Sequence, residues 1–172
     1  MATSRYFPIL GTDFGSGSSY TSYNLAALPP NQVLGSVVEA ASGKVYRLVQ
    51  FDNGSGNVAA VAGGAAYWKT KASFIVTSDI TDEQMGGNSC AGIFTEVVTD
   101  QYYTWIQIGG SVSAKCDAGT GVGDVLTAGG STDMELVSTN AGTAPVGVPV
   151  GVCSVAVSGG FATIQLILGN LL

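Results

Sequence analysis

Short apolar runs separated by glycine-rich turns fill the chain from Val33 onward. The chain has 172 residues, of which 25 are glycine, whereas glycine ordinarily makes up about 7% of a protein. Glycine at this density indicates many turns, and short runs between turns are typical of strands. Val, Ile and Thr supply a quarter of the chain, and these side chains suit a pleated, half-buried surface. The sequence therefore predicts an all-β fold, and its length suits one domain.

Composition divides the chain into two regions. Residues 1–32 set aromatic side chains among Gly, Ser, Thr and Asn without strand or helix periodicity, so we predict an extended N-terminal arm. A disordered tail is the alternative, although flexible linkers ordinarily carry fewer aromatics. Residues 33–172 are predicted to form a β-rich domain, a compact β-barrel or β-sandwich of short antiparallel strands. Aromatic side chains often anchor interfaces, and the arm residues that we expect to contact a partner are Arg5, Tyr6, Phe7, Phe14, Tyr20 and Tyr23.

The clearest hairpin lies in the C-terminal third. Apolar and polar residues alternate along 146–157 and again along 161–168, and two glycines at 159–160 connect them. The valines change parity near residues 153–154. A β-bulge at this point would produce such a slip, because it inserts one extra residue into a strand.

Other strands are expected by the same criteria. A hairpin joins 37–40 to 45–51, and 58–67 fits either a short helix or a buried strand of small residues. Residues 109–110, both glycine, form either a turn or a bend within one long strand. The remaining expected strands are at 74–77, 91–98, 102–108 and 111–116.

The chain contains no histidine. Ser-His-Asp and Cys-His catalysis are therefore excluded, together with metal sites that need histidine. We expect neither enzyme activity nor a cofactor.

Three polar segments have a structural and a functional explanation. Residues 81–84 match a capping box, so Asp79, Asp82 and Glu83 are interpreted as capping groups rather than as an acid-base or Ca²⁺ cluster. Segment 52–57 lacks the spacing and the terminal Glu of a calcium loop and is interpreted as a turn. Segment 119–124 lacks the Lys-Ser/Thr of a phosphate-binding loop, so a turn is again the interpretation.

The three cysteines are widely spaced and odd in number. Cys90, Cys116 and Cys153 fit neither a metal motif nor a closed set of disulfides. We interpret them as buried thiols, since free cysteine behaves as a small hydrophobe. An inter-subunit disulfide is the alternative, which a reducing compartment disfavours.

Charge is scarce in this chain. Charged residues make up 10% of it, and 6 basic against 12 acidic residues give a net charge of −6, so we expect no nucleic-acid partner. No apolar run approaches the roughly 20 residues of a bilayer span, and no secretory signal follows the first residues, so neither membrane insertion nor export is expected. Because charge depletion marks the centre of interfaces, we expect a homo-oligomer, with a trimer as the favoured state.

Aromatic residues cluster in the segment that contains Tyr102, Tyr103 and Trp105. They could form a platform for carbohydrate, but on a sheet such side chains more often fill a core or an interface. Carbohydrate binding is therefore the less favoured interpretation.

Four segments carry a resemblance to a known family. They are GIFTEVVTDQYYTWIQIGG at 92–110, VSA at 112–114, GDVLTAG at 123–129 and VGVPVGV at 146–152. Together these segments resemble the small head-decoration, or cement, proteins of tailed bacteriophages. The resemblance covers residues 33–168 and leaves the arm outside.

The resemblance implies a function without catalysis. Such a protein is a compact β-barrel or β-sandwich on the outer capsid surface of the virion, often a trimer, bound to the major capsid protein and made in the bacterial host cytoplasm. Our first hypothesis is a structural virion protein that stabilises the capsid by binding across shell subunits. The alternative is a head-fibre or tail-associated receptor-binding module that recognises host glycans through Tyr102, Tyr103 and Trp105.

Overall fold

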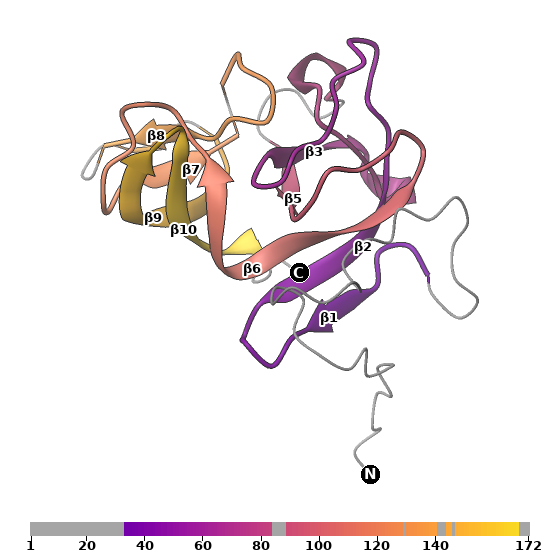
Figure 1. The fold of residues 1–172 in the computed structure, drawn as a ribbon, viewed down its shortest axis with the longest axis horizontal. Helices are drawn as coiled ribbons and strands as arrows, with labels where there is room; N and C mark the ends of the chain where they lie inside the picture. Colours follow the sequence, from indigo (N-terminus) through magenta and orange to yellow (C-terminus); the bar gives the residue numbers. More distant parts are fainter. Residues whose placement is uncertain (1–32, 84–88, 129, 141–143, 146, 169–172) are drawn as a thin grey trace.

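The computed structural model describes residues 33–83, 89–128, 130–140, 144–145 and 147–168. In this part of the chain there is no α-helix, and ten strands form one continuous hydrogen-bonded sheet (Figure 1). The prediction of an all-β fold is confirmed, whereas the predicted arm lies outside the described residues. The strands are β1 Val37–Glu39, β2 Val45–Phe51, β3 Ala65–Thr70, β4 Ile75–Thr77, β5 Cys90–Phe94, β6 Tyr103–Lys115, β7 Val125–Thr127, β8 Val137–Thr139, β9 Pro149–Ser158 and β10 Phe161–Leu166.

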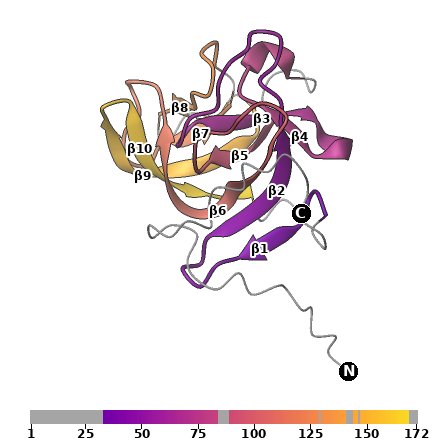
Figure 2. The same ribbon diagram turned by 45° about the vertical axis from the view of Figure 1, so that its right-hand side comes forward.

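A closed β-barrel forms one half of the fold. Its strands follow the order β2-β4-β3-β5-β6, and pairing of β2 with β6 closes it (Figure 2). β1 continues the edge of β2 that β4 leaves free, since β1 pairs with the first residues of β2 and β4 with its last two. The other pairings of the ten strands are antiparallel, as predicted, whereas the β2–β4 pairing is parallel.

β6 joins the barrel to the second half of the fold (Figure 1). The two glycines at 109–110 lie inside this single strand, so the bend, and not the turn, is the correct alternative. Gly109 pairs with Val45 of β2, whereas Gly110 pairs with Leu166 of β10. The strand therefore changes partners at the bend.

The second half of the sheet runs β6-β10-β9-β7-β8. It curls until Leu136, directly before β8, forms a parallel bridge with Cys116, directly after β6. The expected β9–β10 hairpin is confirmed, and so is its bulge. Thr163 pairs with Val155 and Ile164 with Cys153, which leaves one β9 residue between them unpaired.

Three clusters of buried side chains make up the core. One fills the barrel and includes Val49, Phe51 and Ile106. A second lies between the barrel and the curled sheet and includes Ile164 and Leu126. The third lies on the outer side of β2 and β6 and consists of Tyr46, Leu48 and Trp105.

Several local expectations need correction. Within 58–67 no helix forms, and β3 begins only at Ala65. β4 begins one residue later than expected, because Phe74 adopts a left-handed backbone with φ of 54°. β5 ends at Phe94, four residues earlier than predicted. The capping box at 81–84 is also wrong: the turn spans Ile80–Asp82, and its cap is Asp79, whose carboxylate accepts from Thr81 N.

Candidate interaction surface

The outer side of the β9–β10 hairpin carries an exposed apolar surface. Val152 and Val155 of β9 are 39% and 57% exposed. They lie opposite Gln165 and Thr163 of β10, respectively. We call these four side chains the valine face. Because neighbouring strand residues point to opposite sides, Cys153 points inward and is buried.

A loop beside β9 extends the valine face. Gly123 N donates to Cys153 O at 2.9 Å, and Val157 N donates to Thr120 O at 3.1 Å. These bonds hold the loop against the strand, and they leave Val122 67% exposed. Five of the eight large apolar side chains that the structure exposes belong to this region: Val122, Val148, Val152, Val155 and Phe161.

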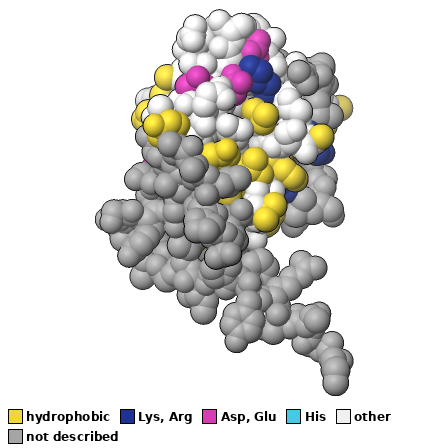
Figure 3. All heavy atoms as spheres, turned by 90° about the vertical axis from the view of Figure 1, so that its right-hand side faces the viewer, with side chains coloured by type: hydrophobic (Ala, Val, Ile, Leu, Met, Phe, Trp, Pro, Cys, Tyr) yellow, Lys and Arg dark blue, Asp and Glu magenta, His cyan; other side chains and the backbone are white. Residues whose placement is uncertain are grey.

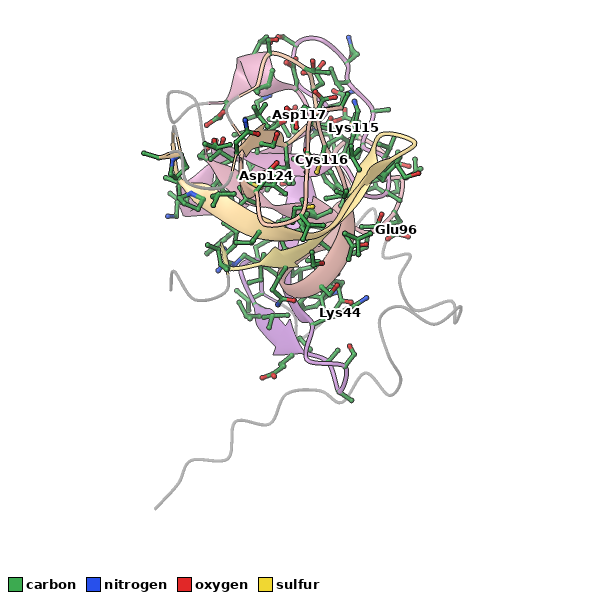
Figure 4. All side chains as sticks on the ribbon, turned by 90° about the vertical axis from the view of Figure 1, so that its left-hand side faces the viewer. Lys44, Glu96, Lys115, Cys116, Asp117 and Asp124 are labelled. Carbon is green, nitrogen blue, oxygen red and sulfur yellow. The ribbon has the colours of Figure 1, made fainter. Side chains whose placement is uncertain are left out.

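The valine face is also free of charge. No charged residue occurs between 136 and 168. Lys115 of β6 lies opposite Phe161 of β10, and its ammonium donates to Asp133 O at 3.1 Å. Figure 4 views the molecule from this side, and the charged side chains that it labels lie outside β9 and β10. On the opposite side, acidic and basic side chains lie close together (Figure 3). Depletion of charge with retention of apolar area is typical of an interface core.

No local motif marks the residues of the valine face as a contact surface. The missing charge after Leu136 was the available signal. No local sequence pattern could have placed Val122 beside this face. Its loop is held against β9 by hydrogen bonds between residues that are thirty or more positions apart in the chain.

The arm residues predicted to contact a partner lie outside the described residues. These are Arg5, Tyr6, Phe7, Phe14, Tyr20 and Tyr23. Their contact role stays a prediction.

The aromatic segment does not form an exposed platform. Trp105 is 3% exposed and packs with Tyr46 and Leu48, while Tyr102 and Tyr103 are half-buried against two of the cores. The less favoured alternative, an exposed carbohydrate platform, is therefore wrong for Trp105, whose place in the core agrees with the favoured interpretation.

The segment 52–57 is a turn held by carboxylates. Asp79 accepts from Gly56 N at 2.9 Å, and Asp82 accepts from Ser55 N at 2.7 Å. The ammonium of Lys69 lies between two of the nearby carboxylates, Asp52 and Asp82. A protein cation thus already occupies the position that a bound cation would need, and no group of three or more potential metal ligands occurs among the described residues.

The segment 119–124 is a turn as well. Asp124 accepts from Gly121 N at 2.7 Å, and Gly123 N is engaged by β9. Asp117 at the start of this turn accepts from Ser138 N at 3.2 Å. These amide groups, which would cradle a phosphate, therefore already bond within the protein. Figure 4 shows Asp117 and Asp124 in the same half of the fold as Lys115 and Cys116.

All three thiols are free and buried. Burial raises the pKa of Cys90 and of Cys116 to about 12. It also raises the pKa of Cys153. The prediction of buried thiols is confirmed, and this placement makes them unsuited to nucleophilic chemistry or to a bond between subunits.

Comparison with known proteins gives no relative. No protein-family model matches the chain, and no curated protein has a significant sequence match. In the described part of the chain, no helix has the length and apolar character needed to cross a bilayer.

Proposed function

We propose that the protein is a structural component of a bacteriophage virion that decorates and stabilises the outer surface of the capsid. The observation that carries this proposal is the charge-free valine face. Apolar surface gains about 25 cal/mol for each Å² removed from water, and this face contains no charge whose desolvation would offset that gain. The major capsid protein is the proposed partner.

The proposed mechanism is preferential binding to the assembled shell. A protein that spans neighbouring shell subunits binds the assembled state and not the separated subunits, so mass action shifts the equilibrium towards assembly. Contacts made by uncharged side chains are screened little by salt. Attachment through the valine face should therefore persist at high ionic strength.

Two further contacts belong to this proposal. Residues 1–32 act as an arm that adds aromatic anchors on the shell, and the protein assembles as a homotrimer. Sedimentation equilibrium at micromolar concentration tests the second point. A single species of 17.3 kDa, the mass of one chain, would contradict it.

The capsid contact is tested with purified particles of the phage that encodes the chain. We expect Val155→Lys to lower co-sedimentation with undecorated capsids by at least about tenfold, since about 1.4 kcal/mol suffices for that factor. Val97→Lys is the matched control, because Val97 is 68% exposed and follows β5, a barrel strand that pairs with β3 and β6 and not with β9. Equal loss with both variants, or loss with neither, contradicts a role of the valine face.

Copy number tests the function itself. Labelling of intact virions should find the protein in hundreds of copies over the head. A few copies at one vertex or on the tail would instead support the receptor-binding alternative, and absence from the virion would refute both.

A further inference from the structure

Arg47 is a cation inside the barrel. It lies on β2, where it pairs with Val37 of β1 and Ile106 of β6, and only 9% of the residue is exposed. Val49 and Phe51, at alternate positions on the same strand, belong to the barrel core. Arg47 therefore points to the side of β2 that faces this core.

An aromatic ring lies next to the guanidinium. Its central carbon lies 5.8 Å from the centroid of the Trp68 ring, a cation–π arrangement. Trp68 meets Phe74 edge to face at 6.2 Å. The Phe74 ring in turn packs against Gly35, where a Cβ atom would lie only 2.3 Å from it. The side of the guanidinium that faces Trp68 is thus apolar and closely packed.

No anion balances this cation within the described part of the chain. The ion pairs found there both belong to Lys69, although the whole chain has 12 acidic residues. Arg47 Nε is buried without a hydrogen-bond partner. Burial also lowers the pKa of Arg47, which reflects the cost of removing a charge from water.

The two terminal nitrogens of Arg47 differ from Nε in their exposure to solvent. The two terminal nitrogens make no hydrogen bond to a described residue, and they are not among the fully buried polar atoms without a partner. They are therefore not fully buried, and a group from outside would approach the guanidinium at this end. Together the two terminal nitrogens form a fork that matches the two oxygens of a carboxylate.

We propose that Arg47 is an anion site that receives a carboxylate group at its two terminal nitrogens. A single positive charge next to an aromatic ring balances a planar monoanion, whereas a phosphate dianion needs further cations or amide donors. The carboxylate comes either from an acidic side chain of a docked protein or from a free carboxylic acid. This site is independent of the proposed capsid contact, because it lies on β2 and not on β9.

Side-chain nitrogen spectra of the full-length protein test the site directly. The chain has only two arginines, Arg5 and Arg47, so ¹⁵N labelling gives two Nε–H signals, and Arg47→Lys assigns them. On titration with sodium acetate at constant ionic strength, we expect the Arg47 signal to shift and saturate while the Arg5 signal stays in place. Equal shifts of both signals, no shift, or the same shift with sodium chloride would overturn the proposal.

Further titrations identify the ligand class and its source. Inorganic phosphate at the same ionic strength should shift the Arg47 signal less than acetate, and a larger shift would overturn the assignment to a carboxylate. A blocked tripeptide, acetyl-Gly-Glu-Gly-amide, should also saturate the signal. Tighter binding of the peptide than of acetate assigns the site to a protein side chain, and the reverse order assigns it to a free acid.

Thermal unfolding distinguishes a ligand-binding role of Arg47 from a purely structural role in packing. Arg47→Met keeps an unbranched stem and removes the charge. We expect its melting temperature in chloride to equal or exceed that of the wild type, because the unpaired buried Nε is gone, and we expect acetate to raise the melting temperature of the wild type only. A lower melting temperature of Arg47→Met in chloride, with no effect of acetate on the wild type, would show that Arg47 only closes the barrel.

Discussion

The ammonium of Lys69 lies 2.8 Å from Asp52 Oδ1 and joins strand β3 to the turn at 52–57. The same ammonium lies 3.2 Å from Asp82 Oδ2. One cation thus links three segments that are separate in the sequence. A side chain of the protein occupies the centre of this carboxylate group, so the turn needs no metal ion.

We expect Lys69→Met to lower the free energy of unfolding by about 1 kcal/mol, as for a partly exposed pair with charge-assisted hydrogen bonds. Urea titration measures the change. Lys71→Met, at an exposed position in the short turn after β3, should leave stability unchanged. Calcium should not raise the melting temperature of the wild type, and a clear rise would contradict the assignment of Lys69 as the resident cation.

Acid should destabilise the same turn. The hydrogen bond from the Thr81 hydroxyl lowers the pKa of Asp79 below its ordinary value of 3.8, and bonds from Gly56 N and Thr81 N add to the effect. A carboxyl whose pKa is lower in the folded chain stabilises it above the unfolded pKa, and this contribution is lost as pH falls through the folded pKa.

We therefore expect the urea concentration at the unfolding midpoint to decrease when the pH is lowered below about 4. Asp79→Asn should lower the midpoint at neutral pH and flatten this decline, whereas Glu39→Gln, at an exposed position on β1, should change neither. An undiminished acid decline in Asp79→Asn would assign the effect to other carboxyls.

Local pattern predicted the hairpins, because alternation and turn residues belong to neighbouring positions. The bulge in β9 was predicted for the same reason, from the parity change of the valines. The capping box failed because the turn begins at Ile80, so that Asp79 and not Thr81 is its cap. The bridge between Cys116 and Leu136 joins distant segments, and the surroundings of Arg47 come from three other strands. Such features depend on the closure of the sheet, which no local pattern encodes.

The bend in β6 should tolerate no side chain at Gly110. Its φ is +81°, and a Cβ there would lie 3.0 Å from Gly43 O. We expect Gly110→Ala to cost about 1–3 kcal/mol from backbone strain and crowding. Gly159→Ala, with φ of +60° and open space around it, should cost less. Gly119→Ala, where no positive φ is needed, should be neutral. Equal costs at all three positions, measured by urea unfolding, would contradict the role of Gly110.

The thiols should be protected in the folded protein. Burial places the pKa of Cys90 and Cys116 at about 12, so almost no thiolate forms at pH 8. We expect a thiol reagent such as Ellman's reagent to label the native chain slowly and all three cysteines rapidly in guanidinium chloride. Rapid labelling of the native chain would show that at least one thiol is accessible.

Glu96 should make the protein less stable as pH rises. The residue is half-buried after β5, between Thr95, whose hydroxyl donates to Trp105 O at 3.1 Å, and the exposed Val97. Burial without a cationic partner among the described residues raises the pKa of Glu96 to about 7 from an ordinary value of 4.5. Between these two pH values the folded chain holds a proton that the unfolded chain has lost. Stability therefore declines as pH rises through this window and levels off above it.

Glu96→Gln removes this decline, because the amide stays neutral at every pH. We expect the variant to match the wild type near pH 4.5 and to exceed it at pH 8 by about 1–2 kcal/mol, a value reduced for the partial exposure of the carboxyl. Urea midpoints measured from pH 4.5 to 8 follow the difference, with Glu39→Gln as the control that keeps the wild-type profile. If Glu96→Gln is less stable than the wild type at pH 8, the carboxylate is stabilised by a partner and the burial argument fails.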